Sequence, residues 1–155
     1  MNILRSRATI TCVREQSVIK KLYDELAMLQ EEYPGFEEWF FGKVVPGVLS
    51  GSRLVFVAKY DDRVAGILIL KNSDEKKICT LRVAPEFRRM GIGHQLMDCA
   101  IDALNISRPV ITVSDDHIQE FSRFLIRDYK FVPTEIHYGY YRDDHVEYVF
   151  NGTLD

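Results

Sequence analysis

Cysteine, long apolar runs and an excess of charge of one sign are all scarce in this chain of 155 residues. Its three cysteines are odd in number and lack the CxxC or Cys/His spacing of zinc ligands, which argues against a disulfide framework and against a metal site. No apolar run approaches the roughly 18 residues of a membrane span, and residues 1–7 are too short and too charged for a secretory signal. We therefore expect a soluble, cytoplasmic protein with reduced thiols and with no metal and no membrane partner.

The overall charge is close to neutral. A formal charge of -3 and a pI near 5.8 argue against a general nucleic-acid-binding protein. A local basic cluster near the N-terminus is most simply a solvated face; it comprises Arg5, Arg7, Arg14, Lys20 and Lys21. With 46% hydrophobic residues and no repeat, low-complexity tract or linker, the chain is expected to form one domain over residues 1–155, with a core that needs neither disulfides nor metal.

The most informative stretch joins an apolar strand to an amphipathic helix through a basic turn that contains two glycines. The strand is predicted over 77–83, and Pro85 ends it because proline cannot donate a ladder hydrogen bond. From Gly93 onward, apolar residues recur with the i, i+3, i+4 spacing of a helix that lies on a sheet. The apolar positions are Cys79, Leu81 and Val83 on one face of the strand, and Leu96, Met97, Ala100, Ile101 and Leu104 on the helix.

A helix start of this kind is an anion-binding site. Its first amide N–H groups have no partner within the helix, and the macrodipole adds about half a positive charge, so phosphate is favoured there. Because Gly91 and Gly93 carry no Cβ, a pyrophosphate can approach these amides, although close packing of the helix is the alternative reason for two glycines. Arginine and histidine side chains add charge or donors. The predicted cradle consists of Arg88, Arg89, Met90, Gly91, Ile92, Gly93 and His94.

This segment resembles the acetyl-CoA signature of the GNAT superfamily of N-acetyltransferases. The signature Arg/Gln-x-x-Gly-x-Gly/Ala is matched by Arg88, Gly91 and Gly93, and the Val-x-Pro element that precedes it in the family is matched by residues 83–85. The resemblance implies an α/β fold of mixed α+β character: one GNAT-like domain whose central twisted sheet is mixed, mostly antiparallel, and built of about six to seven strands flanked by about four helices.

The order of elements expected along the chain agrees with this family, so the resemblance extends over nearly the whole sequence. Strands are expected at 8–13, 54–58, 64–70, 77–83, 109–113, 131–141 and 146–150, helices after Ser17, after Gly93 and over 118–129, and a helical or irregular segment over 36–49. Ser17 is expected to cap the first helix, and residues 33–35 to break the chain after it.

The resemblance implies transfer of an acetyl group from acetyl-CoA to a primary amine of a small molecule, peptide or protein, by direct attack on the thioester and without a metal. Main-chain groups of Leu81, Arg82 and Val83 would hold the pantetheine arm and the oxyanion, and Gln119 would begin a late-helix motif on the coenzyme side. A homodimer is a further implication. Two other functions stay open: a non-catalytic acyl-CoA-binding or regulatory module, and a toxin-like acetyltransferase of charged tRNA, which only the basic cluster suggests.

In many family members a tyrosine on the late helix protonates the departing thiolate. The motif Asn-x-x-Ala-x-x-Phe-Tyr-x-x-x-Gly-Phe aligns with residues 119–131. Ser122 then falls at the alanine, Ile126 at the tyrosine and Lys130 at the glycine, so the phenol is missing from its usual place. Either Tyr129 or Ser122 acts after a local shift, or water protonates the thiolate, or catalysis has been lost.

The family has no fixed general base. Asp115, Asp116 and His117 follow a predicted strand, but helix capping is the first role expected of an aspartate at such a position. The acceptor wall is expected from residues 33–49 together with the closing hairpin, because aromatic, loop-rich segments set specificity in such scaffolds.

The closing hairpin supplies the remaining catalytic candidates, His137 and Tyr138. Alternation along its first strand places Tyr138 and Tyr140 on one face, and His137 and Tyr141 on the other. One face would border the acceptor, where a histidine or a phenol can move a proton. Ordinary packing on the sheet is the simpler role for each of these aromatic residues.

Overall fold

A seven-stranded mixed sheet forms the centre of the computed structural model, which describes residues 8–154. Its strands are β1 (Thr9–Val13), β2 (Arg53–Tyr60), β3 (Arg63–Asn72), β4 (Lys76–Val83), β5 (Val110–Ser114), β6 (Pro133–Tyr138) and β7 (Val146–Phe150). They are ordered β1-β2-β3-β4-β5-β7-β6, with β4 and β5 parallel and the other neighbours antiparallel. The expected fold class is confirmed.

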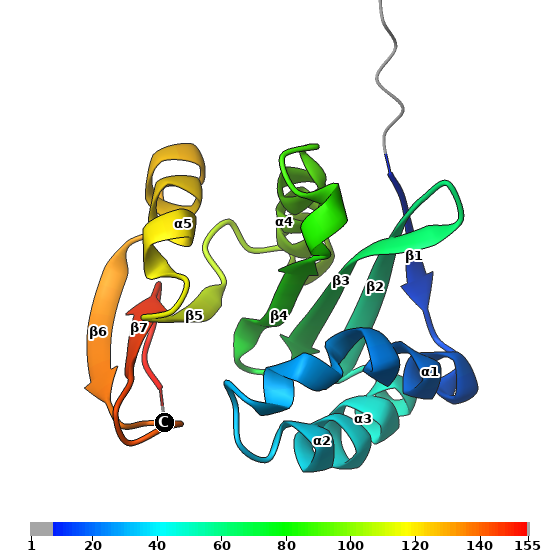
Figure 1. The fold of residues 1–155 in the computed structure, drawn as a ribbon, viewed down its shortest axis with the longest axis horizontal. Coiled ribbons are helices and arrows are strands. Elements are labelled where there is room, and N and C mark those ends of the chain that lie inside the picture. Colours follow the sequence, from blue (N-terminus) through cyan, green and yellow to red (C-terminus); the bar gives the residue numbers. More distant parts are fainter. Residues whose placement is uncertain (1–7, 155) are drawn as a thin grey trace, which may run out of the picture.

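Helices cover both faces of the sheet (Figure 1). They are α1 (Gln16–Leu26) with a 3-10 turn at Ala27–Gln30, α2 (Phe36–Trp39), a π-helical turn at Phe40–Val44, α3 (Val45–Ser50), a 3-10 turn at Pro85–Phe87, α4 (Ile92–Leu104), and α5 (Ile118–Ser122) with a π-helical continuation at Arg123–Asp128. In Figure 1, α1 to α3 lie at the bottom and α4 and α5 at the top. No helix within residues 8–154 is both long and apolar enough to cross a membrane.

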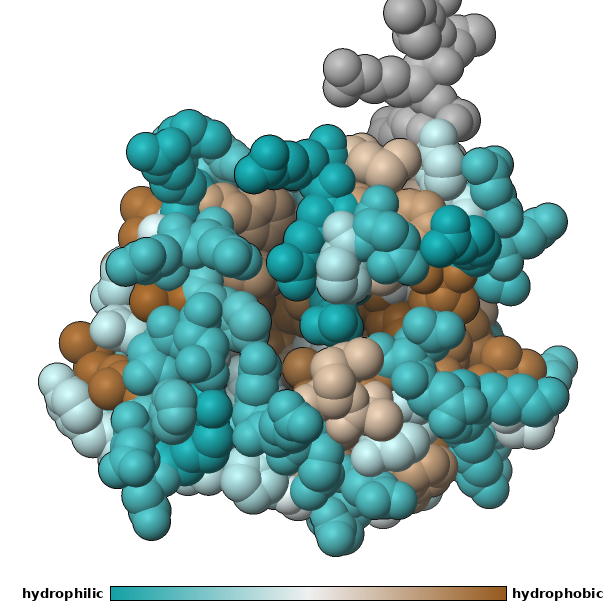
Figure 2. All heavy atoms as spheres, in the orientation of Figure 1, coloured by the Kyte–Doolittle hydropathy of each residue, from teal (hydrophilic) through white to brown (hydrophobic). Residues whose placement is uncertain are grey.

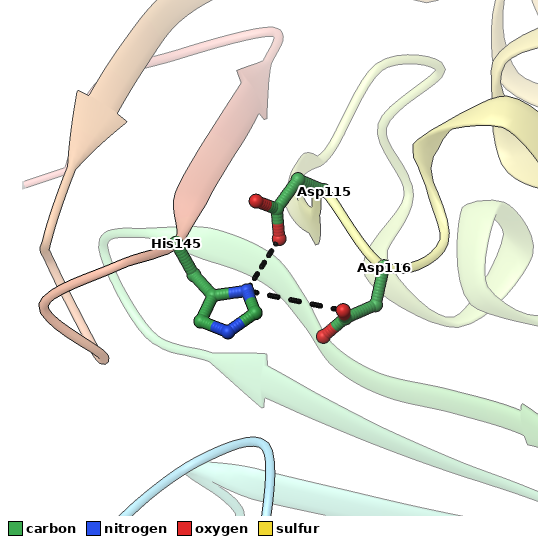
Figure 3. A group of neighbouring side chains, drawn as sticks. All are labelled: Asp115, Asp116 and His145. Atoms are coloured by element: carbon green, nitrogen blue, oxygen red, sulfur yellow. Dashed lines mark hydrogen bonds and ion pairs between the residues drawn. The ribbon is translucent and has the colours of Figure 1, made fainter.

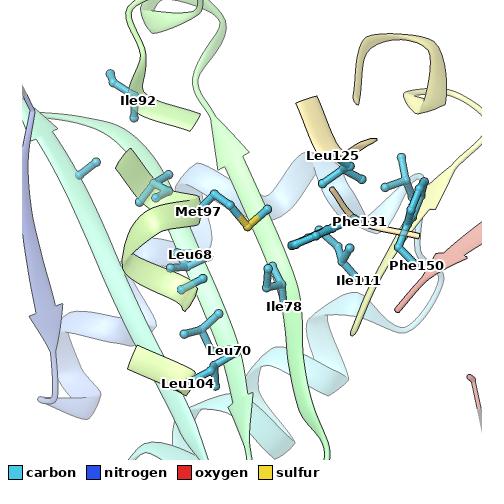
Figure 4. Packing of buried hydrophobic residues seen from close by; sticks show 14 of the residues in the cluster. Leu68, Leu70, Ile78, Ile92, Met97, Leu104, Ile111, Leu125, Phe131 and Phe150 are labelled. Carbon is cyan, nitrogen blue, oxygen red and sulfur yellow. The ribbon is translucent and has the colours of Figure 1, made fainter. Parts of the chain in front are cut away.

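The central strand β3 is buried on both faces and divides the core into two clusters. One cluster lies against α4 and the late helix and is seen in Figure 4, and the other lies against α1 to α3. Each fully buried leucine or isoleucine contributes about 1.5–3 kcal/mol. A Cβ on Gly66 would lie 2.9 Å from Leu96 Cδ1, so glycine lets α4 pack this closely on β3. Alternate residues of β3 divide between the clusters: Leu68 and Leu70 in the first, Ile67 and Ile69 in the second.

The first helix begins differently from the prediction. It starts at Gln16 with Glu15 at the N-cap, so Ser17 lies inside the first turn and the expected capping is wrong. The segment over 36–49, expected to be helical or irregular, is helical and runs on to Ser50, with Pro46 in the first turn of α3 directly after the π-helical turn.

A β-bulge in β4 changes the face of the sheet on which its side chains lie. The register against β3 skips Cys79, between Ile78 and Thr80. Cys79 therefore packs with the cluster under α1 to α3, whereas Leu81 and Val83 pack with the cluster under α4. The prediction that these three residues share one face is wrong, because regular alternation does not anticipate an inserted residue.

Beyond the bulge, β4 and β5 diverge. In the described part of the chain, their parallel ladder joins Lys77 to Val110 and Ile78 to Ile111 and goes no further. The rest of β4 stays paired with β3 on one side, and no strand among residues 8–154 pairs with its other main-chain edge. Buried main-chain groups need hydrogen-bond partners. The middle of the sheet is therefore open to a ligand.

Candidate functional site

A cleft of about 1060 Å³ opens where β4 and β5 diverge. Its walls come from distant parts of the chain: the loop before α2, the ends of β2 to β5, the start of α4, the late helix and the β6–β7 turn. Figure 2 shows apolar atoms in a hollow at the centre of one face, between hydrophilic residues on either side. Small-molecule pockets occupy roughly 300–1,000 Å³, so this cleft has room for a long ligand together with a second, smaller one.

One end of the cleft is the start of α4. Gly91 is the N-cap with a φ of 80°, and Arg89 has a φ of 63°, so the turn leaves the first amides of α4 facing the cleft. A Cβ on Gly91 would meet no atom within 4 Å, and one on Gly93 would meet Phe124 at 3.9 Å, so these glycines keep space open and do not serve tight packing. The predicted cradle residues that line the cleft are Arg88, Arg89, Gly91, Ile92, Gly93 and His94. Met90 is 43% exposed and is not among the lining residues.

The open edge of β4 forms the next part of the cleft. Leu81, Arg82 and Val83 all line it, as the resemblance implies. The imidazole of His94 lies 3.0 Å from the Asp128 carboxylate and meets the ring of Phe124 edge-on at 4.8 Å. The residues of the cradle and the open edge of β4 therefore line one continuous wall of the cleft.

Tyr129 lies outside the cleft. Its hydroxyl donates to the Asp98 carboxylate at 2.8 Å and to the main-chain carbonyl of His94 at 3.1 Å. Burial and the bond to Asp98 raise the pKa of the Tyr129 phenol above its usual range. In this structure Tyr129 fastens the late helix to α4 and does not face the opening between β4 and β5.

The other late-helix candidates also lie away from the opening. The Ser122 hydroxyl donates to the carbonyl of Gln119 at 3.4 Å, and neither residue is among those that line the cleft within 8–154. Ile126 is 44% exposed. Lys130 has a φ of 59°, the conformation that favours glycine, which fits its alignment with the glycine of the family motif.

The closing hairpin divides its aromatic residues differently from the prediction. His137 is bonded to Glu135, and Tyr138 is 81% exposed; neither lines the cleft. Tyr140 and Tyr141 both line it, because β6 ends at Tyr138 and the chain turns there. The expected pairing of Tyr138 with Tyr140 on one face is therefore wrong.

Glu147 of β7 is a buried carboxyl beside the cleft that the sequence analysis missed. It is 4% exposed, and burial raises its pKa from 4.5 to about 7. The Tyr33 hydroxyl donates to Oε1 at 3.4 Å, and the Thr112 side chain bonds to the same carboxyl. Tyr33 and Thr112 both line the cleft, so Glu147 is one hydrogen bond away from it. The signal in the sequence is a lone acidic residue inside an otherwise apolar closing strand.

Aromatic rings surround this carboxyl. Tyr33 meets Tyr141 edge-on at 5.1 Å, and Tyr140 meets Tyr141 at 4.7 Å. Burial raises the pKa of Tyr141 to about 12, so the phenol stays protonated near neutral pH. Nearby, Ser114 lines the cleft with 0% exposure, and its hydroxyl has no hydrogen-bond partner among residues 8–154.

Asp115, Asp116 and His145 form a network at the rim of the cleft (Figure 3). His145 Nδ1 lies 2.9 Å from Asp115 and 3.8 Å from Asp116, and Arg142 donates to Asp116 at 2.5 Å. The bond from His145 lowers the pKa of Asp115. His117 is the N-cap of α5, so the capping expected of the aspartates is wrong. Arg142 and His145 belong to the β6–β7 turn and bond to Asp116 and Asp115 on the loop after β5, so the network holds this turn in place, and we do not assign a metal to it.

The family model described as "Acetyltransferase (GNAT) family" matches residues 17–108. The chain belongs to this family. No curated protein sequence matches this GNAT protein. Its family membership therefore rests on the segment from α1 to the end of α4, which contains the cradle.

Solved structures share the fold of this GNAT protein at low sequence identity. An acetyltransferase of Bacillus subtilis in complex with CoA is 18% identical, with 92% of this chain and 97% of that chain covered and a TM-score of 0.65. The ribosomal-protein-S18-alanine N-acetyltransferase of Escherichia coli is also 18% identical, with 92% and 91% covered and a TM-score of 0.65. A protein of Bacillus anthracis, named as a candidate streptothricin acetyltransferase and bound to acetyl-CoA, is 16% identical with a TM-score of 0.55; the match covers 64% of this chain and 61% of that one.

Proposed function

We propose that this GNAT protein binds acetyl-CoA along α4 and β4 and transfers the acetyl group to a primary amine. The observation that carries the proposal is one cleft that joins the α4 cradle to the Tyr33–Glu147 pair through the opening between β4 and β5. Similar structures contain CoA or acetyl-CoA, which supports the same coenzyme here. In this proposal residues 1–155 act as a single domain in the cytoplasm, and homodimerisation stays a prediction of the family resemblance.

The residues present fit the coenzyme. The free amides at Gly91 and Gly93 suit a pyrophosphate, and the side chains of Arg88 and Arg89 add positive charge beside it. The open edge of β4 offers main-chain donors and acceptors to the amides of a pantetheine arm. Gln119 has no part in this proposal, because its exposed side chain does not line the cleft.

Glu147 is proposed as the general base. The bound coenzyme supplies a thioester carbonyl that an uncharged amine can attack. As the nitrogen bonds to that carbon, it gives up a proton to the Tyr33 hydroxyl, which passes its own proton to Glu147. A carboxyl with a pKa of about 7 is suited to this role, since a general base works best near the ambient pH.

Water is proposed to protonate the departing thiolate. Tyr129 and Ser122 stay bonded to neighbours outside the cleft. A thiolate leaves readily near neutral pH, and one general acid contributes about 10²–10⁴-fold, so turnover continues without the phenol. His137 and Tyr138 have no assigned role, since neither lines the cleft.

A non-catalytic acyl-CoA-binding module is the second candidate, favoured by the exposed Ile126 at the position of the family's phenol. Action on charged tRNA has less support. Arg5 and Arg7 lie outside the described residues, and the exposed Lys20 and Lys21 are followed on α1 by Asp24 and Glu25. The α1 surface is therefore of mixed charge.

Calorimetric titration with acetyl-CoA, followed by a thiol-release assay over a panel of primary amines, tests the proposal. Micromolar binding with amine-dependent release of CoA is expected. Binding without release for any amine would favour the second candidate. Absence of binding would contradict the coenzyme assignment. Titration with adenosine is the control, because adenosine lacks both the phosphates and the acyl arm.

A further inference from the structure

Three cations stand side by side at the end of the cleft away from α4. Arg53 on β2 lies opposite Lys71 on β3, and Lys71 lies opposite Lys77 on β4. Directly opposed residues share one face of the sheet, and all three line the cleft. We call Arg53, Lys71 and Lys77 the cation row. Like charges placed directly opposite each other destabilise a sheet, so the row is costly unless an anion offsets it.

The protein itself supplies only part of the negative charge that would offset the cation row. Glu75 pairs with Lys71 at 3.2 Å. Within residues 8–154, neither Arg53 nor Lys77 has a carboxylate at ion-pair distance. Three positive charges therefore face one negative charge, and the two cations without a carboxylate partner border the cleft.

Arg53 is held in place rather than left mobile. Its guanidinium lies over the ring of Trp39 at 5.5 Å, and Nη1 donates to Cys79 Sγ at 3.2 Å. A Cβ on Gly47 would fall 2.4 Å from Arg53 Cγ, so the absence of a side chain there makes room for the arginine stem. A guanidinium has five N–H donors, and a fixed one is preorganised to bind a carboxylate or a phosphate.

The position of the row separates it from the coenzyme cradle. Lys77 and Val83 are six residues apart on β4, which is about 20 Å at ~3.3 Å per residue, and the cradle lies beyond Val83. Cys79 connects the row to the proposed base: its sulfur contacts Arg53, and its proximity contributes to the raised pKa of Tyr141, which packs against Tyr33. The row and the Tyr33–Glu147 pair thus border the same acceptor half of the cleft.

We propose that the acceptor is a small zwitterion, in which the amine reaches the Tyr33–Glu147 pair while a compact anionic group, a carboxylate or a phosphate, binds Arg53 and Lys77. This inference rests on the proposed function and names its substrate class. Aromatic rings of Tyr33 and Tyr141 flank the amine end, which suits an ammonium group: it gives its first proton to solvent before the uncharged amine attacks, and its second passes through Tyr33 to Glu147.

Binding without turnover tests the inference. Protein saturated with CoA is titrated by calorimetry with amino acids, with the amines that lack only their carboxylate, and with the matching aminoalkyl phosphonates. The zwitterions are expected to bind at least about 10-fold more tightly than the simple amines, since charge-assisted bonds are strong. Comparison of carboxylates with phosphonates identifies the anion.

Variants locate the anion site. Arg53→Gln and Lys77→Gln should each remove most of the preference for zwitterions and leave binding of simple amines unchanged. Lys76→Gln is the matched control, because Lys76 is the neighbour of Lys77, bonds to Asn72 at 2.5 Å and does not line the cleft. Its preference should match the wild type.

Equal binding of zwitterions and simple amines by the wild type would overturn the inference, and so would a preference that survives both variants. In either case amine-dependent release of CoA would still support acetyl transfer. Conversely, a zwitterion preference without any release of CoA would support the anion site and remove the proposed catalysis.

Discussion

Replacing Glu147 by glutamine should lower activity and raise stability at the same time. Glutamine keeps the shape and the hydrogen bonds of the buried side chain but cannot take up a proton. A general base contributes about 10²–10⁴-fold, so kcat/KM for the amine should fall by that factor, whereas the affinity for acetyl-CoA should stay within about 2-fold. Detection of the released thiol, in a stopped or a continuous assay, measures kcat/KM. Calorimetry measures the affinity for acetyl-CoA.

The stability change follows from the raised pKa of Glu147. Its ordinary value is 4.5 and its folded value about 7, so the folded state holds a proton over a range in which the unfolded state has lost it. Stability is therefore full below pH 4.5 and falls as the pH rises through 7. At ~1.4 kcal/mol for each tenfold change in proton affinity, the loss is about 3 kcal/mol. Glu147→Gln should avoid this loss and unfold at a higher temperature than the wild type at pH 8, with no such advantage at pH 4.

The pH profile provides a second readout. Wild-type kcat/KM should rise with pH through about 7 as the carboxyl ionises, and this step should be absent in the variant. An amine of low intrinsic pKa avoids confusion with titration of the acceptor. Glu135→Gln is the control, since Glu135 is a neighbouring strand carboxyl that bonds to His137 outside the cleft. A Glu147→Gln protein with wild-type kcat/KM would refute the assignment of the base, whatever its stability.

Three further outcomes are expected. Tyr33→Phe should reduce kcat about 10-fold or more by breaking the relay to Glu147, and a wild-type rate would show that protons take another path. Gly93→Leu should weaken acetyl-CoA binding at least about 10-fold by filling the phosphate approach, whereas Gly42→Leu, at another helical glycine with open space around it, should not; calorimetry compares the two. Tyr129→Phe should lower the free energy of unfolding by about 1 kcal/mol in urea titration with kcat nearly unchanged, and a large drop in kcat would restore Tyr129 as an acid.

Local patterns predicted most of the fold. Alternation and helical spacing give the strands and α4, because each element buries a face whose period is visible over a few residues. The turn before α4 was predictable for the same reason: two arginines and two glycines at fixed spacing are a local signal. The β-bulge at Cys79 carries no such signal, since it depends on how β3 and β4 pair.

The acceptor side was mostly beyond sequence reasoning. Tyr33 and Glu147 are 114 positions apart and meet only through the fold. The raised pKa of Glu147 comes from burial, which no spacing rule gives. The cation row has the same origin, since Arg53 and Lys77 belong to different strands and look like ordinary surface charges in the sequence. The exposed position of Tyr138 at the end of β6, outside the cleft lining, likewise has no signal in the sequence.

The extra residue in β4 also bears on how this protein can diverge. The opening of the sheet begins where the β4–β5 ladder ends at Ile78, directly before the extra residue, and both are features of the main chain and not of particular side chains. Substitutions along the cleft can therefore change the acceptor while the opening persists. Deletion of Cys79 would be different in kind: it would remove the unpaired residue and leave Ile78 and Thr80 opposite Leu70 and Ile69 in a ladder without a bulge. In this fold, point mutations can change the specificity of the cleft, whereas an insertion or a deletion in β4 changes the strand that forms it.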